Sequence, residues 1–206
     1  PLGASSSWST QTVDLTAYSS ATSVIRFEAT SDFGTDDIAI DEVRVKVLSN
    51  PTYATLPYIQ NFDGTWVDRR PGTSTDIPDT YWIIAPEMSN NSWRRQNEGS
   101  LADWTSASSG ANTPYGGSGG CASFHTYSCV SGVTGRMDLY VDLSPAGTKE
   151  LFFEYRNTSG TDQLDVYLSQ DGGATFPTLL KTIVTSSTWI TYVVDLYSYS
   201  SATSVS

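Results

Sequence analysis

Residues 150–176, ELFFEYRNTSGTDQLDVYLSQDGGATF, carry the pattern that indicates the fold class. Two alternating runs, ELFFEYRN (150–157) and QLDVYLSQ (163–170), are each followed by a cluster of Gly, Asp, Ser and Thr. Alternation with a period of two residues is typical of β-strands, and such clusters are typical of turns. The alternation recurs in SVIRFEA (23–29), DIAIDEVRVKV (37–47), MDLYVDL (137–143), LLKTIVT (179–185) and WITYVVDL (189–196). Many short strands without a helical period predict an all-β sandwich or barrel.

One segment of the chain occurs twice. WSTQTVDLTAYSSATSV (8–24) and WITYVVDLYSYSSATSV (189–205) match at 12 of 17 positions without a gap, at an offset of 181 residues. Self-similarity at a fixed spacing is the signature of a repeat array. The chain is therefore predicted to hold a little more than one repeat of the size of a domain.

A domain boundary is visible in LSNPTYATLPYIQNFDG (48–64), because proline cannot serve in a central strand. We expect residues 1–48 to be the closing strands of one repeat and residues 49–57 to be a linker. Residues 58–206 are then the next repeat without its last two strands. Within it, the segment 68–120 is rich in Pro, Gly, Ser and Asn and is predicted to form long loops with two short strands.

Three stretches resemble a known group of domains. SVIRFEATSDFGTDDIAIDEVRV (23–45) resembles the closing strands of MAM-like jelly rolls, and LPYIQNFDGTW (56–66) resembles the opening of cleaved-adhesin and choice-of-anchor domains of secreted bacterial proteins. KELFFEYRNTSGTDQLDVYLSQDGGATF (149–176) is similar to their middle strands. The resemblance implies a two-sheet antiparallel β-sandwich of jelly-roll type that binds carbohydrate or protein at bacterial surfaces. It also implies tandem copies and a structural calcium ion.

The order of these stretches is permuted, since the ending comes before the beginning. Three arrangements remain open: the chain is an excerpt of a tandem array, residues 25–47 fold back onto their own chain, or they complete a neighbouring copy by strand addition. The last arrangement gives a head-to-tail filament that does not close. Pairing of residues 37–47 with residues 58–63 distinguishes the three.

Asp41 is the first candidate metal ligand. If Val43 and Val45 point to the core, period two also directs Asp41 inward, where a carboxylate is costly unless it is paired or bound to a metal. Asn61 and Asp63 supply further oxygen atoms of the kind that Ca²⁺ prefers. In the fold that the chain resembles, the first and last strands lie side by side, which would bring the three together. A β-bulge at Asp41, or hydrogen bonds to backbone N–H groups, is the alternative.

The two cysteines, Cys121 and Cys129, flank an expected strand in CASFHTYSC. In a chain that looks extracellular they suggest a disulfide, with two buried thiols as the alternative. They do not match the four-cysteine framework of animal MAM domains. The single histidine, His125, lies between them and is expected to be a surface strand residue.

Aromatic residues gather in and beside the loop-rich segment. Exposed aromatic rings with polar neighbours form stacking platforms for sugars or anchors for protein partners. Packing against the end of the sandwich is the alternative. If the segment is a binding face, at least two of the four tryptophans will be exposed. The candidates are Trp66, Trp82, Trp93, Trp104 and Tyr115.

Composition and motifs limit the function classes. The chain has 22 Asp and Glu against 11 Lys and Arg, a net charge of −11, which argues against a nucleic-acid partner. No apolar run approaches the roughly 20 residues of a membrane span, so we expect no membrane insertion. The sequence contains no HExxH, GxSxG or phosphate-cradling loop. These features favour a protein that is not an enzyme.

We therefore expect a non-catalytic adhesive or structural module of a secreted or surface-anchored bacterial adhesin with several repeats. Its partners would be a glycan, a surface protein or neighbouring copies of itself. Two alternatives remain: a carbohydrate-binding module attached to an extracellular enzyme, and a filament subunit that assembles head to tail by strand complementation.

Overall fold

The chain forms two compact units in the computed structural model. Unit 1 spans Pro1–Val45 and unit 2 spans Lys46–Ser206. The residues that the structure describes are 11, 13–18, 20–30, 38–41, 43, 45, 51–69, 76–107, 112–157, 161–183 and 185–199.

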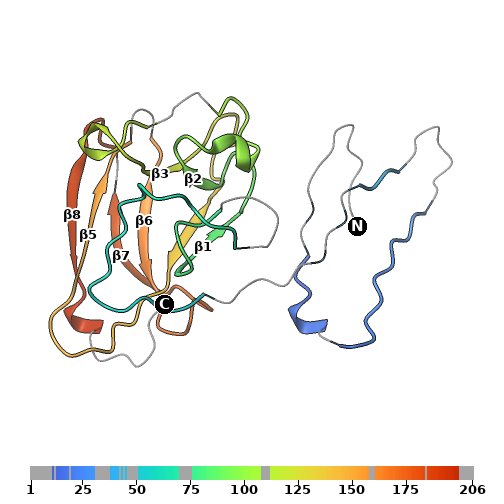
Figure 1. Ribbon diagram of the computed structural model, residues 1–206, viewed down its shortest axis with the longest axis horizontal. Coiled ribbons are helices and arrows are strands. Elements are labelled where there is room, and N and C mark those ends of the chain that lie inside the picture. The colour runs from blue at the N-terminus through green and yellow to red at the C-terminus, as the bar shows by residue number, and fades with distance from the viewer. Residues whose placement is uncertain are drawn as a thin grey trace. The chain divides into compact units, whose positions relative to one another are not determined.

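Unit 2 is built from short antiparallel β-strands (Figure 1). Its described residues form β1 (Trp82–Ala85), β2 (Trp93–Arg95), β3 (Ala122–Phe124), β4 (Arg136–Leu139), β5 (Glu150–Tyr155), β6 (Leu164–Leu168), β7 (Thr178–Ile183) and β8 (Ile190–Asp195). They also form three short 3-10 helices, η2 (Gly99–Ala102), η3 (Tyr115–Gly117) and η4 (Tyr197–Tyr199). The described chain is thus β-rich, as predicted, and contains no α-helix. None of its helices has the length and apolar character needed to cross a membrane.

The strands pair in four two-stranded antiparallel ribbons, β1–β4, β2–β3, β5–β8 and β6–β7. Strands β5 to β8 coincide within two residues with the runs predicted from alternation, because turn residues bound those runs, whereas β4 overlaps only the start of the predicted run 137–143. Strands β1 and β2 are the two short strands expected within segment 68–120. Both are held by partners far along the chain, since Trp93 lies opposite Phe124 and Trp82 opposite Leu139.

Unit 1 contains the short helix η1 (Thr16–Tyr18), and its described residues form no strand. The runs 23–29 and 37–47 were expected to be strands. Residues 23–29 and the described part of the second run, 38–41, 43 and 45, carry no strand pairing. A β-strand needs a hydrogen-bonded neighbour, so alternation alone does not produce one. Residues 37, 42, 44, 46 and 47 lie outside the described residues, and the expected pairing of 37–47 with 58–63 stays a prediction.

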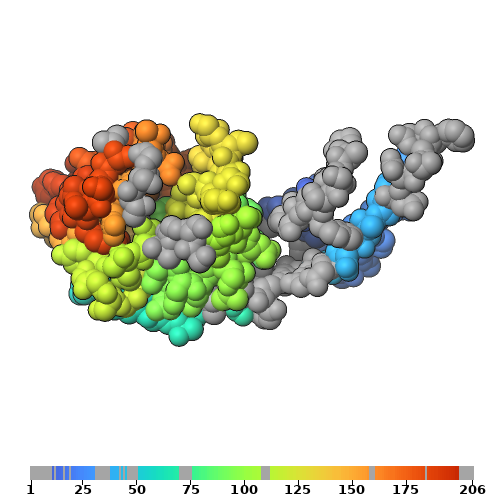
Figure 2. Space-filling view, turned by 90° about the horizontal axis from the view of Figure 1, so that it is seen from above, coloured from blue at the N-terminus to red at the C-terminus, as the bar shows by residue number. Residues whose placement is uncertain are grey.

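Two hydrophobic cores hold unit 2 together, and Figure 2 shows the unit as a continuous packed body. The first, here called the leucine core, receives side chains from all four strands of the β5–β8 and β6–β7 ribbons: Leu143, Leu168, Val194 and Leu196 are buried, and Val141, Leu151, Phe153, Leu180 and Tyr199 pack against them. The second, here called the tryptophan core, buries Trp66, Ile77, Trp82 and Ile84 beside the β1–β4 ribbon.

A hydrogen-bond network ties the beginning of unit 2 to β1. The Tyr58 hydroxyl donates to Asp79 Oδ2 at 2.6 Å and accepts from Trp82 Nε1 at 2.7 Å. Gln60 Nε2 donates to the same Asp79 oxygen at 2.9 Å. Burial and the neighbouring Asp79 raise the pKa of Tyr58, so the phenol keeps its proton and its role as a donor.

The chain just before this network pairs with the segment that follows β4. Ala54 forms a parallel bridge with Val141, in which its N–H donates to the Tyr140 carbonyl and its carbonyl accepts from Asp142 N–H, both at 2.9 Å. The expected linker 49–57 therefore includes residues that take part in the fold of unit 2.

Candidate functional site

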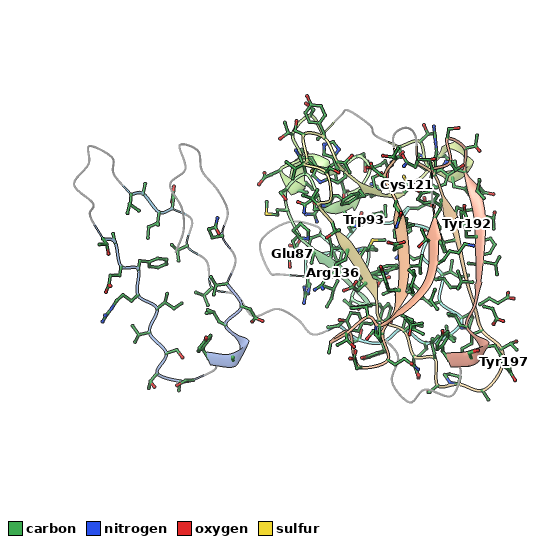
Figure 3. The ribbon with its side chains drawn as sticks, turned by 180° about the vertical axis from the view of Figure 1, so that it is seen from behind. Glu87, Trp93, Cys121, Arg136, Tyr192 and Tyr197 are labelled. Carbon is green, nitrogen blue, oxygen red and sulfur yellow. The ribbon has the colours of Figure 1, made fainter. Side chains whose placement is uncertain are left out.

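Most of the apolar side chains described in unit 1 are exposed. They include Val13, Leu15, Tyr18, Val24, Ile25, Phe27, Ile38, Ile40, Val43 and Val45. Figure 3 shows side chains along the described part of this unit projecting from the chain. An exposed apolar surface rimmed by polar residues is typical of an interaction site. This segment is therefore the candidate functional site.

The sequence repeat is also a structural repeat. Helix η1 (Thr16–Tyr18) and helix η4 (Tyr197–Tyr199) occupy the same positions of the two copies, 181 residues apart. The same hydrogen bond closes each turn: Tyr18 N–H donates to the Leu15 carbonyl, and Tyr199 N–H donates to the Leu196 carbonyl, both at 2.9 Å. The two copies thus share this turn, whereas the residues before it form strand β8 in unit 2 and no strand among the described residues of unit 1. Residues 8–10, 12, 19 and 200–205 of the repeat lie outside them.

Burial separates the two copies. Val194 is 8 % exposed in the leucine core, whereas its equivalent Val13 is 73 % exposed. Leu196 is 7 % exposed, whereas Leu15 is 38 % exposed. Unit 1 therefore exposes the valine and leucine whose equivalents in unit 2 are buried in the leucine core.

A hollow in unit 1 lies among these side chains. It is open to solvent, has a volume of about 500 Å³, and is lined by Leu15, Tyr18, Ser23, Val24, Ile25 and Val45. The equivalents of Leu15 and Tyr18 in unit 2 are Leu196 and Tyr199, which contact the leucine core. Two of its six lining residues, Leu15 and Tyr18, are therefore at positions that in the second copy belong to or pack against the leucine core.

Residues 24–28 continue this surface as an amphipathic stretch. Period two places Ile25 and Phe27 on one side and Arg26 and Glu28 on the other. Arg26 Nη1 and Glu28 Oε2 form an exposed ion pair at 3.8 Å. By this pattern Ile25 and Phe27 form an apolar side, and the opposite side carries the Arg26–Glu28 ion pair together with Val24.

Unit 2 presents an apolar pair of its own on the β5–β8 ribbon. Phe152 and Val193 lie directly opposite each other in the ladder, and both are exposed. Their neighbours Leu151 and Val194 point to the leucine core. Strand β8 pairs only with β5 among the described residues, so its second edge has no strand partner there.

Asn61 and Asp63, two of the predicted calcium ligands, hold a turn in unit 2. Asn61 Oδ1 accepts from Asp63 N–H at 3.1 Å, and Asp63 Oδ1 accepts from Gly120 N–H at 2.7 Å. Gly119 has a φ of +86°, and a Cβ atom there would lie 1.9 Å from Asp63 Oδ1. Only a glycine therefore allows this close approach without movement.

The guanidinium of Arg95 contacts the same turn. Arg95 Nε donates to the Phe62 carbonyl at 3.3 Å, and Nη2 donates to the Asp63 carbonyl at 3.2 Å. Its Nη1 lies 3.5 Å from Glu98 Oε1. Two backbone oxygens beside the predicted ligands thus already contact a cationic group.

Asp41, the third predicted ligand, is in unit 1 and is exposed, in contrast to the core-facing position expected from alternation. The described residues contain no group of three or more His, Cys, Asp or Glu able to hold a metal ion. The predicted set contains only two residues of these types, Asp41 and Asp63, because its third member is Asn61. The absence of such a group from the described residues therefore does not test it, and calcium binding by these three residues stays a prediction.

The expected exposure of the tryptophans is wrong. Trp66, Trp82 and Trp104 are buried, which leaves Trp93 as the one half-buried member of the four. Trp66 and Trp82 form the tryptophan core because the loop-rich segment has few other large apolar side chains to fill the end of the unit. Tyr115, by contrast, is exposed and contacts Trp189 edge to face.

The predicted disulfide does not form in the structure. Cys121 and Cys129 are both free thiols, Cys121 buried and Cys129 partly exposed. Strand β3 begins directly after Cys121 and carries the chain away at about 3.3 Å per residue, whereas a disulfide needs Cα atoms within about 7 Å. Cys121 Sγ instead lies 4.0 Å from Ser123 Oγ and from the Asn112 carbonyl.

His125 is buried rather than on the surface as expected. Its Nε2 lies 3.0 Å from the Thr105 carbonyl, with which it forms a hydrogen bond. The imidazole therefore belongs to the packing of the η2 loop.

The burial of the charged residues Asp76, Arg94 and Lys149 was not predicted from the sequence, and Arg94 is the most deeply buried of them. Arg94 is fully buried, and its Nη2 donates to the Glu87 carbonyl at 2.6 Å. Burial lowers the pKa of Arg94, while Asp76 and Glu87 act in the opposite direction. Alternation in the sequence places Arg94 on one face with Ser92 and Gln96. Because all three are polar, hydrophobicity alone would predict that this face is exposed to solvent.

No family model, curated protein or solved structure matches the chain.

Proposed function

We propose that the chain is a non-catalytic structural and adhesive module of a secreted or surface-anchored protein built from tandem repeats of a jelly-roll β-sandwich. The observation that supports this most directly is the pair of turns η1 and η4, which share their position in the repeat and their closing hydrogen bond. One turn ends a strand of a packed domain. The other turn, η1, follows Val13 and Leu15, which are equivalent to residues buried in that domain but are exposed in unit 1.

Three features support the jelly-roll part of the proposal. The described strands pair antiparallel, the β5–β8 and β6–β7 ribbons share one core, and a turn containing Asp171, Gly172 and Gly173 follows β6. Two packed antiparallel layers with strands of this length are common in extracellular adhesive modules. A calcium ion held by Asp41, Asn61 and Asp63 is part of the same proposal.

A glycan array probed with the full chain tests the adhesive role against the closest alternative. A structural module should show no preferred glycan, or weak binding to many. A single glycan class bound at micromolar affinity would instead support a carbohydrate-binding module and overturn the structural role. The array should be repeated with Tyr115→Ala, because Tyr115 is the exposed member of the predicted aromatic set.

A further inference from the structure

We propose that unit 1 docks on a second copy of this chain by strand exchange, in which its repeat segment takes the place of β8 and η4 on that copy's leucine core. The inference deepens the proposed function and rests on its tandem-repeat part. The occupant of the exposed apolar surface is thus a second copy of the same chain.

The first argument is that the donated segment fits a core that is already known. Val194 and Leu196 are buried in the leucine core, and Tyr199 packs against it. Val13, Leu15 and Tyr18 are the same residue types at the same repeat positions. At these three positions the donated segment can make the same contacts. At Tyr192, which stacks on Phe153 with ring centroids 5.8 Å apart, the equivalent residue is Gln11, so this ring contact is lost in the exchange.

The second argument is the hollow. Leu15 and Tyr18 line it, and in unit 2 their equivalents meet Leu143, Leu168 and the side chains around them. The same side chains of a second copy would fill the hollow with the contacts that Leu196 and Tyr199 make now. An apolar hollow of about 500 Å³ that stays open to water forfeits those contacts.

The third argument concerns the balance of the exchange. Replacing Val194, Leu196 and Tyr199 by their equivalents changes little by itself. The donated segment continues into Ile25 and Phe27, both exposed in the chain, with the Arg26–Glu28 ion pair on the opposite side. The exchanged state is favoured to the extent that the acceptor copy covers these two additional apolar side chains.

The register of the docking follows from the repeat. Val13 takes the position of Val194, which lies opposite Leu151 in the β5–β8 ladder. A shift by one residue would turn the apolar side chains to the solvent face, so the core selects one register. The donor surface and the acceptor core differ, which makes the contact heterologous.

Sedimentation of the full chain over a range of concentrations is the first test. The wild-type mass should rise with concentration. Leu15→Asp should weaken association about tenfold or more, because a carboxylate placed on a buried apolar face is strongly unfavourable. Glu28→Gln is the matched control, since it changes charge on the opposite side of the same segment and should leave association close to wild type. All three chains should keep the same melting temperature of unit 2.

Photo-crosslinking identifies the contact. Tyr18 is replaced by p-benzoylphenylalanine, and ¹⁴N- and ¹⁵N-labelled chains are mixed, incubated and irradiated. Crosslinked peptides of mixed isotope that join position 18 to the Leu143 or Leu168 region are expected. Crosslinks confined to one isotope mean that a chain covers its own segment, and mixed crosslinks between two unit 1 segments mean that unit 1 pairs with itself. Either result, or a wild-type mass that stays monomeric at all concentrations, overturns the proposal.

The two experiments separate this inference from the proposed function. Association that Leu15→Asp abolishes, together with one preferred glycan on the array, would overturn the structural role and leave strand exchange standing. A chain that stays monomeric and shows no preferred glycan would overturn strand exchange and leave the structural role standing.

Discussion

The indole ring of Trp104 stacks on the imidazole ring of His125, with ring centroids 4.7 Å apart and planes inclined by 14°. Trp104 Nε1 donates to Ser92 Oγ at 2.9 Å, so the ring is fixed at its edge as well as its face. Gly99 lies against the indole, and a Cβ atom there would be 2.2 Å from Trp104 Cε3. One tryptophan therefore joins helix η2, strand β3 and the start of β2.

Trp104→Ala should lower the free energy of unfolding by about 3–5 kcal/mol, as expected for deleting a large buried aromatic side chain. Trp104→Phe keeps a stacking ring and loses the N–H donor, so it should cost less. Chemical denaturation followed by circular dichroism measures both. Equal stability of Trp104→Ala and wild type would contradict the central packing role of this ring.

The two copies of the repeat should respond differently to the same substitution. Leu196→Ala should reduce the free energy of unfolding by about 2–5 kcal/mol, because the side chain is buried in the leucine core. Leu15→Ala should change it by less than about 0.5 kcal/mol in dilute solution, where unit 1 is exposed. Urea unfolding at low protein concentration makes the comparison. Similar losses for the two variants would mean that Leu15 is already covered in the monomer.

Asp171 should titrate at unusually low pH. The Thr175 and Ser169 hydroxyls and the Thr175 N–H donate to its carboxylate and lower the pKa of Asp171 to about 2. Since the folded pKa lies below the unfolded one, the contribution of Asp171 to stability is present above about pH 4 and is lost as the pH falls through about 2. Carboxyl carbon NMR shifts measured against pH follow this group directly.

Asp171→Asn supplies the control for that titration. It should remove the low-pH inflection and loosen the turn between β6 and β7, visible as faster amide exchange at Gly173, whose N–H donates to Ser169 Oγ at 2.9 Å. An ordinary pKa near 4 in the wild-type protein would show that the turn does not hold the carboxylate in solution.

Both cysteines should react as free thiols. Burial raises the pKa of Cys121 and of Cys129, so each is protonated and slow to alkylate at neutral pH. Cys129 is the more accessible and should react first with iodoacetamide. Intact mass after denaturing alkylation without reductant should show two added groups. No added group would establish the disulfide that the sequence suggested.

Calcium should raise the melting temperature by several degrees if Asp41, Asn61 and Asp63 bind it, since a ligand that binds only the folded state stabilises that state. Asp63→Asn keeps the acceptor for Gly120 N–H and removes the negative charge, so it should abolish the calcium effect with little change in chelator. Asp103→Asn, on the η2 loop, is a charge-matched control. A wild-type melting curve unchanged between calcium and excess chelator would exclude the site.

Local pattern was sufficient to predict strands β5 to β8 and insufficient to locate β1 and β2 or to predict burial. Strands β5 to β8 follow from alternation between turn residues, which depends on neighbours in sequence. Val13 and Val194 occur in nearly the same sequence, yet one is exposed and the other buried, because burial depends on which distant strands are present to cover them. The sequence similarity of the two copies therefore does not predict which copy is buried.

The misplaced aromatic residues and Arg94 have a related cause. Polar loops around Trp66 and Trp104 suggested exposure, but each ring fills a space that the short strands leave. In β2 the buried side is that of Arg94, with Ser92 and Gln96 beside it, while Trp93 is only half-buried. Hydrogen bonds to distant backbone groups make this polar face suitable for burial, and hydrophobicity does not report such bonds.

The six-residue ladder between β5 and β8 has a consequence for the speed of assembly. A donated segment can enter only after β8 has left its place, so the rate of exchange is set by the opening of that ladder and of the core behind it rather than by diffusion. Local opening of a core strand approaches the cost of global unfolding. Assembly should therefore be slow to begin, accelerate steeply on warming and, once formed, persist on dilution far longer than its affinity alone would suggest.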